Sequence, residues 1–488
     1  MTRLHSSFFL PATVFGLMAA SCGGKTDDSQ LQVSVIGGAA VIADPNAGPL
    51  DPAEASLITA TAQGLVRYDA QGQIEPGLAI RWAISEDGLY YTFRLADITG
   101  LNADLVARHL RAVIARRSNN AIKPILGAID EIVAVTPAVV EIRLKAARPN
   151  LLDLLAQPEL AVITKKVATG PLTIARNDKS FVLLQPMTPP DPDDALRPSE
   201  LERQSIRLRG ERTSVAVARF VAGEADLVLS GRLTDFAIAQ AGGFRARDIR
   251  FDPVSGLFGL EAIERGGFIG NGENRRALAM AIDRDRIGTA FGVASLQPST
   301  TLVAPGTSEL PQPAQPGWSA NGLAARRTAA STIIRLWKQA HPDDPASVRI
   351  ALPDHPGSRL LFALVRSDWA AIGVRAQRVD INADADLRLI DEVAPAQTAT
   401  WYLRHFTCDR SPVCSEAADT ALDIAREASH PVERAARIAD ADLRMAELVP
   451  YIPLAQPVRW SLVAQRVTSF ATNNRGVHPL NHLVENVR

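Results

Sequence analysis

Helix and strand patterns alternate through residues 323–379, and this alternation narrows the choice of fold more than any other segment does. Apolar residues recur at helical spacing over 323–340 and 360–372, whereas 348–352 and 374–379 are short apolar runs typical of strands. Strands that alternate with helices form βαβ units, in which helices cover a largely parallel sheet. We therefore expect an α/β fold, with a separate lobe in this half of the chain.

The first half of the chain has a mixed pattern. Apolar residues alternate over 89–95 directly after an Asp-Gly turn, which predicts a half-buried hairpin. Residues 102–117 predict a helix capped by Asn102, and 139–144 predict a strand. Five prolines over 186–198 exclude regular structure there and predict a surface loop.

Length and charge limit the classes of function. A chain of 488 residues with 47% hydrophobic residues exceeds what one core usually holds, so we expect two or three lobes. The 52 Lys and Arg are balanced by 53 Asp and Glu, which gives a formal net charge of -1. Since no net field attracts a polyanion, we do not expect nucleic acid as a partner.

The amino terminus predicts export. Residues 1–21 combine a cationic Arg3, an apolar run of about 13 residues and a small-residue end, as signal peptides do. A permanent transmembrane anchor is the alternative, but the run is shorter than the roughly 20 residues that a spanning helix needs.

Cys22 follows this segment directly and stands before a polar segment that runs to residue 30. This arrangement resembles a bacterial lipobox, which implies lipidation of Cys22 and a tether over 22–30. The alternative is cleavage nearby with Cys22 as an incidental thiol.

The two remaining cysteines, Cys408 and Cys414, are separated by five intervening residues in a polar segment. In an exported protein this spacing favours a local disulfide that closes a seven-residue loop. His405 and Asp409 lie nearby, but the ligand spacing of a zinc site is absent, so we expect no metal.

Motifs for catalysis are missing from the sequence. It has no phosphate-binding G-x-x-x-x-G-K-[ST], no G-x-S-x-G and no H-E-x-x-H. The glycine-rich run over 266–272 does not follow a strand in dinucleotide-binding register, and we interpret it as a flexible connection. We therefore expect neither enzymatic activity nor a cofactor, although distant residues can also assemble a catalytic site.

Several collinear segments resemble one protein family. Residues 64–69 read Gly-Leu-Val-Arg-Tyr-Asp, and 72–79 read Gly-Gln-Ile-Glu-Pro-Gly-Leu-Ala. Further matching segments are 82–88, 91–95, 102–110, 168–171, 223–226, 275–287, 449–454 and 467–470. In this order they resemble extracytoplasmic solute-binding protein family 5, the oligopeptide-, dipeptide- and nickel-binding proteins of ABC importers. The family's usual Trp and Asp-Gly are missing at 97–101, which weakens the link to its peptide-binding subgroup.

The resemblance implies a two-lobed periplasmic-binding-protein fold of type II, in the large cluster that has an extra subdomain in lobe I. It implies lobe I at 31–257, lobe II at 258–454 and a return to lobe I at 455–488. The extra subdomain would span about 65–165. The chain would cross between the lobes near 253–263 and 449–460, and ligand would be enclosed by hinge closure.

The resemblance also suggests a ligand site in the second lobe. Many family members have an acidic residue after a Trp there, which pairs with the amino terminus of a peptide. Here Arg404 and His405 stand near that position, which leaves Asp409 as the candidate partner for an ammonium group. A cationic, aromatic cleft would instead suit an anionic or amphipathic ligand. The candidate ligand contacts are Trp401, Tyr402, Arg404, His405, Phe406 and Asp409. The alternative is that Trp401 and Phe406 are core residues and that Arg404 is solvated.

The functional prediction that follows is a lipid-anchored binding protein of the periplasm or cell envelope. It would act as a monomer, capture a small solute such as a short peptide, and deliver it to an ABC permease and ATPase complex. The main alternative is an envelope sensor or scaffold that uses the same fold without transport. An envelope hydrolase is a third possibility and would need a nucleophile beside a base in the cleft.

Overall fold

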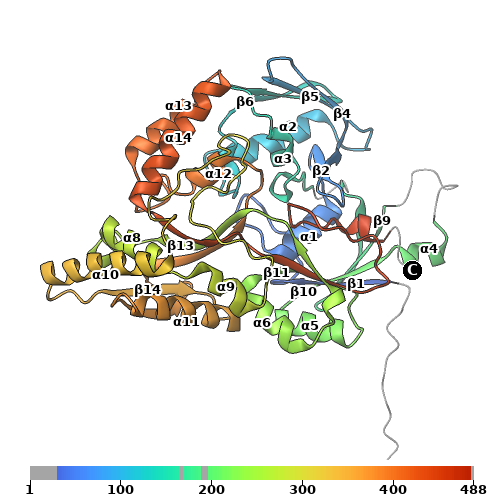
Figure 1. The fold of residues 1–488 in the computed structure, drawn as a ribbon. Coiled ribbons are helices and arrows are strands. Elements are labelled where there is room, and N and C mark those ends of the chain that lie inside the picture. The colour runs from blue at the N-terminus through green and yellow to red at the C-terminus, as the bar shows by residue number, and fades with distance from the viewer. Residues whose placement is uncertain (1–29, 165–168, 188–195, 485–488) are drawn as a thin grey trace, which may run out of the picture.

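The computed structural model describes residues 30–164, 169–187 and 196–484. The predicted signal peptide (1–21), Cys22 and the tether up to residue 29 lie outside these ranges, as does most of the proline-rich segment at 186–198. In Figure 1, β13 (Gly256–Ala262) and β14 (Ser347–Leu352) lie at the lower left, and β1 (Leu31–Ile36), β10 (Ile206–Glu211) and β11 (Leu227–Arg232) lie at the lower right.

A seven-stranded sheet contains β1, β10 and β11, with the order β12-β18-β11-β1-β10-β9-β8. The first strand, β1, pairs in parallel with both β10 and β11, and the outer strands are antiparallel. The strands are β1 (Leu31–Ile36), β8 (Leu172–Asn177), β9 (Val182–Pro186), β10 (Ile206–Glu211), β11 (Leu227–Arg232), β12 (Ile249–Asp252) and β18 (Arg459–Val463). Its helices are α1 (Pro52–Thr61), α4 (Pro198–Arg203), α5 (Thr213–Val221) and α6 (Leu233–Gly242).

A smaller antiparallel sheet lies within the range predicted for the extra subdomain. Its order is β4-β5-β7-β6, and the predicted hairpin is confirmed as β4 and β5. The predicted helix is confirmed as α2, whose first turn is capped by the Asn102 side chain accepting from the Leu105 amide at 2.9 Å. The strands of this sheet are β4 (Ala79–Ile84), β5 (Tyr90–Leu95), β6 (Ile129–Thr136) and β7 (Val139–Leu144). Beside them in the chain, β2 (Val66–Tyr68) and β3 (Ile74–Pro76) form a separate two-stranded sheet, and the helices are α2 (Ala103–Ile114) and α3 (Leu151–Leu155). We call this sheet and the seven-stranded sheet, with their helices, lobe I.

A five-stranded sheet with the order β15-β14-β16-β13-β17 forms lobe II. The predicted βαβ unit is confirmed: β14 and β15 pair in parallel and are joined by α11. The strands are β13 (Gly256–Ala262), β14 (Ser347–Leu352), β15 (Arg375–Asp380), β16 (Leu387–Val393) and β17 (Tyr451–Ala455). The helices are α7 (Gly267–Gly270), α8 (Gly272–Ala281), α9 (Arg284–Phe291), α10 (Leu323–Ala340), α11 (Pro356–Ala370), α12 (Ala399–Arg404), α13 (Glu416–Glu427) and α14 (Pro431–Leu448).

One expectation for lobe II was wrong. The glycine-rich run at 266–272 is not merely a connection, because it contains α7 and the start of α8. Asn271 explains the second helix, since its side chain accepts from the amides of Glu273 and Asn274. The cap outweighs the poor helix propensity of the glycines.

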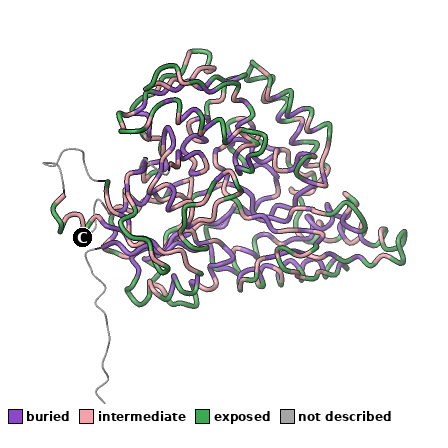
Figure 2. The backbone as a smooth tube through the Cα atoms, turned by 180° about the vertical axis from the view of Figure 1, so that it is seen from behind, coloured by how far each residue is buried: buried purple, intermediate pink, exposed green. Residues whose placement is uncertain are grey.

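The chain passes between the lobes twice, from β12 to β13 at 253–255 and from β17 to β18 at 456–458. Both passages are short. Beside them the lobes share one apolar core, in which Phe236 and Trp460 of lobe I join the same cluster as Leu361 and Trp369 of lobe II. Figure 2 shows buried backbone running through the middle of the molecule and exposed backbone on the outer turns.

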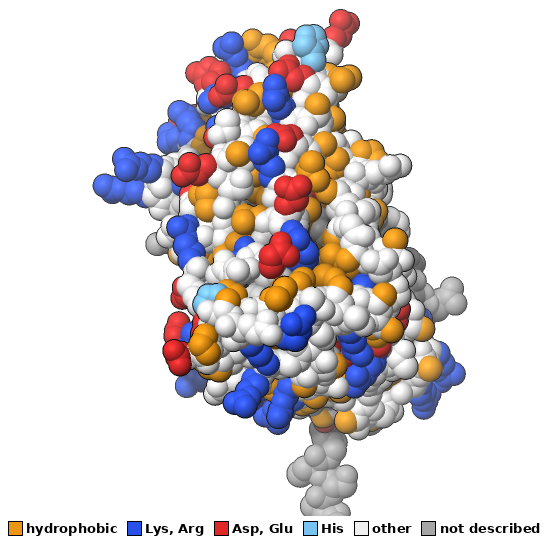
Figure 3. Space-filling view, turned by 60° about the vertical axis from the view of Figure 1, so that its left-hand side comes forward, with side chains coloured by type: hydrophobic (Ala, Val, Ile, Leu, Met, Phe, Trp, Pro, Cys, Tyr) orange, Lys and Arg blue, Asp and Glu red, His pale blue; other side chains and the backbone are white. Residues whose placement is uncertain are grey.

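The outer surface mixes charges. On the face shown in Figure 3, acidic and basic side chains are interspersed over the upper part, among apolar ones. This distribution agrees with the formal net charge of -1.

Candidate functional site: a cavity between the lobes

A cavity of about 1140 Å³ lies between the two lobes. Lobe I contributes residues around 49–50, 118–125 and 157–159, the end of β11 and the segment near 475, whereas lobe II contributes β16 and residues 401–410. The basic residues on the wall are Lys123, Arg232, Arg388, Arg404, Arg410, Arg459 and Arg475, and the acidic ones are Glu159, Glu261, Asp391, Glu392 and Asp409. A space of this size, walled by two lobes, can hold a solute of several residues or rings.

The structure separates the six candidate ligand contacts into two groups. Trp401, Arg404, His405 and Asp409 line the cavity. Tyr402 and Phe406 do not, because both are fully buried in the lobe II core, where the Phe406 ring packs 5.4 Å from that of Tyr451. Tyr402 and Phe406 are four positions apart across the end of α12, so they share the face that points inward. For these two residues, the predicted ligand contact is corrected to a core position.

Trp401 and Arg404 are less available to a ligand than their positions suggest. Trp401 is 8% exposed. One Arg404 Nη donates to the Leu422 carbonyl at 3.3 Å and lies 3.5 Å from Asp423 Oδ1. Burial lowers the pKa of Arg404, and the nearby Arg426 lowers it further. His405 is also buried, which lowers its pKa, and its Nε2 lies 3.7 Å from Glu392.

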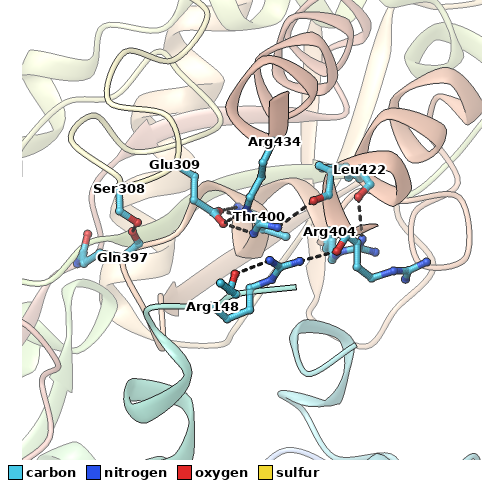
Figure 4. A network of polar contacts seen from close by, with 11 residues as sticks. Arg148, Ser308, Glu309, Gln397, Thr400, Arg404, Leu422 and Arg434 are labelled. Carbon is cyan, nitrogen blue, oxygen red and sulfur yellow. Dashed lines mark hydrogen bonds and ion pairs between the residues drawn. The ribbon is translucent and has the colours of Figure 1, made fainter. Parts of the chain in front are cut away.

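A polar network holds α12 against the rest of lobe II (Figure 4). Glu309 accepts from the main-chain amide of Thr400 at 3.0 Å and from its hydroxyl at 2.6 Å. The other Glu309 oxygen accepts from Arg434 Nε at 3.1 Å. Both Glu309 and Arg434 are largely buried, so this ion pair is protected from solvent. The network fixes the start of the helix that presents Trp401 and Arg404.

Arg148 brings lobe I to the same network. It follows β7, and one Nη donates to the Arg426 carbonyl at the end of α13 at 2.7 Å. Burial lowers the pKa of Arg148 to about 10, with the guanidinium of Arg434 as the next cause. Figure 4 shows Arg148 extending below α12 toward Arg404. The lobes therefore touch at the rim of the cavity.

Cys408 and Cys414 form a disulfide, with sulfurs 2.14 Å apart. The loop that it closes carries Asp409 and Arg410, both on the cavity wall. The amide of Cys408 also donates to Asp419 Oδ2 at 2.9 Å, which ties the loop to α13. The disulfide thus limits the movement of two charged cavity residues.

Sequence reasoning missed the charged residues that the sheet of lobe II presents to the cavity. Glu261 on β13 is the register partner of Arg388 on β16. Burial raises the pKa of Glu261 to about 7, against the opposing effect of Arg388. The Arg388 Nε is buried and has no hydrogen-bond partner among the described residues. Each of these residues lies between apolar neighbours in its strand, and this is the signal that could have found them.

An ion pair joins the lobes at the back of the cavity. Arg459 on β18 of lobe I lies 2.7 Å from Asp391 Oδ1 on β16 of lobe II, and both side chains are largely buried. The second Asp391 oxygen is buried with no partner among the residues that the structure describes. Gln157 and Arg475 of lobe I also donate to the Pro395 carbonyl, at 2.9 and 3.3 Å. These contacts join residues of the two lobes around the cavity.

The described part of the chain shows neither a cluster of metal ligands nor a helix that could span a membrane. Within it, no three His, Cys, Asp or Glu side chains gather closely enough to hold a metal ion. None of its helices is sufficiently long and apolar to cross a bilayer.

Comparison with known proteins gives a family and a fold. A family model for bacterial extracellular solute-binding proteins, family 5 (middle part), matches residues 73–401. The nickel-binding periplasmic protein of Escherichia coli K12 is 33% identical over 124 residues, so the match spans about a quarter of either chain, 23% of this one and 24% of that one.

Solved structures match over almost the whole chain. The murein tripeptide binding protein MppA of Escherichia coli has a TM-score of 0.77 at 17% identity, with 93% of this chain and 97% of that chain covered. OppA of Haemophilus influenzae, solved with the peptide RPPGFSPFR, has a TM-score of 0.76 at 16% identity, with 94% and 98% covered. These likenesses confirm the two-lobed binding-protein fold. Because the family model covers well over half of the sequence, the chain belongs to the bacterial extracellular solute-binding proteins, family 5.

Proposed function

We propose that the protein captures a small solute outside the cytoplasm, between its two lobes, and delivers it to an ABC permease. The observation that carries this proposal is the cavity of about 1140 Å³, whose wall comes from both lobes. A ligand that contacts both lobes favours their closed arrangement, and a permease can distinguish the closed from the open form. Membership in this family makes the chain a binding protein and not an enzyme.

The relatives suggest candidate solutes. The similar proteins are named for binding nickel and a murein tripeptide, and one was solved with a peptide. Short peptides are therefore the first class to test. The proposed division is lobe I at 31–257, lobe II at 258–454 and the return to lobe I at 455–488, and the four-stranded sheet is the proposed extra subdomain.

We also propose that the protein is a lipoprotein of the periplasm, attached through Cys22. The support is the sequence pattern of residues 1–30 together with the extracellular character of the family. Changing Cys22→Ser should abolish the mass of the attached lipid on the mature protein and release it from the membrane fraction. If wild-type protein lacks that mass, or if the variant stays in the membrane, the proposed anchor is wrong.

The first experiment is mass spectrometry of small molecules released by denaturing the protein after purification from its native envelope. A solute present in a stoichiometric amount would support capture and name its class. Binding is then measured by calorimetry on refolded, ligand-free protein. If no solute is released, and neither peptides nor other small solutes bind, the proposed function fails.

A further inference from the structure

We infer that the cavity takes a small hydroxylated acid, such as a sugar acid, whose acid groups are bound by arginines on the cavity wall: Arg388 and Arg410 of lobe II and Arg232 of lobe I. This inference rests on the proposed function and narrows it to one class of solute. It departs from the expectation that a short peptide is held through its amino terminus by Asp409.

Arg388 is the central residue. It lies on β16, in the middle of the lobe II contribution to the cavity wall. Its Nε is inaccessible to solvent and unpaired, and among the described residues no acidic side chain forms an ion pair with its guanidinium. A buried guanidinium donor without an acceptor is costly. An anionic group in the cavity would supply the missing acceptor, because the planar guanidinium suits a carboxylate.

Two more arginines reach the wall without a carboxylate partner within the described ranges. Arg410 is carried by the disulfide loop, and Arg232 ends β11 on the lobe I side. Arg232 faces Arg459 across the neighbouring strand, and the charge of Arg459 is already paired with Asp391. The nearby Asp235 carboxylate is occupied by the Thr213 hydroxyl and the Arg232 amide. Both lobes therefore offer an unpaired guanidinium to the same cavity.

The acidic wall residues do not cancel this charge. Asp391 is paired with Arg459 through one oxygen, and Glu392 is exposed, so water screens its charge. Burial raises the pKa of Glu159 and that of Glu261, which favours their neutral forms. Asp409 is exposed, as Arg410 beside it is, so water weakens the contacts that either side chain can make with a ligand.

Buried oxygen atoms on the cavity wall that lack a hydrogen-bond donor indicate that the ligand carries hydroxyl groups. One oxygen of Asp391 and one of Glu159 are buried on the cavity wall without a hydrogen-bond donor among the described residues. Ligand hydroxyls can donate to such oxygens while an acid group accepts from Arg388. A sugar acid carries both groups on one short skeleton.

The test is calorimetry on the refolded, ligand-free protein with three solutes of one carbon skeleton. These are glucarate with two acid groups, gluconate with one, and glucose with none; trialanine represents peptides. We expect affinity to decrease in that order and trialanine to bind weakly. The change Arg388→Gln should weaken glucarate binding roughly 10- to 100-fold, because it removes a charge-assisted hydrogen bond. Arg335→Gln, at an exposed position on α10, is the matched control and should leave binding unchanged.

A second readout uses pH. The charged groups that face Glu261 are Arg388 and Glu392 of β16 and Arg410 of the loop, with the Ser411 hydroxyl beside them. Burial lowers the pKa of His405, so its positive charge does not increase as pH rises through this range. As pH rises from about 6 to about 8, Glu261 loses its proton, and its new negative charge should weaken glucarate binding several-fold. Glu261→Gln should remove most of this pH dependence.

The outcomes separate the two proposals. If trialanine binds tightly and the acids do not, the inference is wrong and solute capture stands. If Arg388→Gln binds glucarate as wild type does, the role of Arg388 is wrong. If none of these solutes binds and no solute is released from the purified protein, the proposed function itself fails.

Discussion

Trp401 shows how one residue can line a cavity and still belong to the core. Its indole packs edge-on against Tyr402, with ring centroids 4.8 Å apart, and against His405 at 5.6 Å. Only 8% of the residue is exposed. Most of its contribution is therefore to the packing of lobe II rather than to a ligand.

The change Trp401→Ala should lower the free energy of unfolding by about 3–5 kcal/mol, because it empties a large buried volume. Trp401→Phe, which keeps an aromatic ring, should cost clearly less. Urea denaturation followed by circular dichroism measures both. If the alanine variant unfolds at the same urea concentration as wild type, the tryptophan is a surface residue and its role lies with the ligand.

At this scale the sequence predicted the site only in part. It identified residues 401–409 as a candidate, and four of the six named side chains line the cavity. It offered a core position for Phe406 only as the alternative and none for Tyr402, because a helix as short as α12 gives too little periodicity to show which face points inward. It also missed Glu261 and Arg388, whose meeting depends on strands more than 120 residues apart along the chain.

At the scale of elements, α12 depends on a side chain that is remote in sequence. Glu309 holds the first turn of α12 through Thr400 and links it to α14 through Arg434. The helix has six residues and lacks a side-chain cap of its own. Since an isolated helix of this length is unstable, its position follows from this network and from core packing.

Glu309→Ala should therefore destabilise lobe II and loosen the cavity wall together. We expect the free energy of unfolding to fall by about 3–5 kcal/mol, because Arg434 is left buried without its partner. Ligand affinity should fall as well, since α12 loses its anchor. Glu433→Ala, at an exposed position on α14, should change stability by less than about 0.5 kcal/mol. Chemical denaturation measures the free energy of unfolding, and calorimetry measures ligand affinity. If the Glu309 variant keeps the wild-type free energy of unfolding, the predicted role of Glu309 in stability is wrong.

Elements with strong local signals were predicted well. The cap at Asn102 and the apolar spacing after it located α2, and the alternation over 89–95 located β5. Short elements such as α7 and α12 were missed because tertiary contacts, rather than local pattern, stabilise them. The sequence could not show how the strands order within each sheet, since β18 enters the lobe I sheet from the far end of the chain.

At the scale of the whole molecule, polar contacts between the lobes add to the apolar core that the lobes share. Arg148, which follows β7 of the four-stranded sheet in lobe I, donates a hydrogen bond to the Arg426 carbonyl on α13 of lobe II. Gln157 adds a second hydrogen bond, to the Pro395 carbonyl. Such contacts exist only while the lobes are closed, so they shift the balance between open and closed forms.

Arg148→Ala should shift that balance toward the open form without unfolding either lobe. Small-angle X-ray scattering of ligand-free protein should show a larger radius of gyration, and ligand affinity should fall by up to about tenfold, the value of one such hydrogen bond. Arg94→Ala, at an exposed position of the same sheet, is the control and should change neither quantity. If the Arg148 variant has the same radius of gyration and the same ligand affinity as the wild-type protein, this contact does not influence closure.

The two short passages between the lobes also set an order of assembly during synthesis. Lobe II is one continuous segment whose first and last strands, β13 and β17, pair with each other, so it can fold as soon as residue 455 leaves the ribosome. The large sheet of lobe I must wait for β18, which lies between β11 and β12. A chain that stops shortly before residue 459 would therefore contain a finished lobe II beside a lobe I with a missing strand. The segment from residue 459 onward thus completes the large sheet of lobe I and adds Arg459 and Arg475 to the cavity wall.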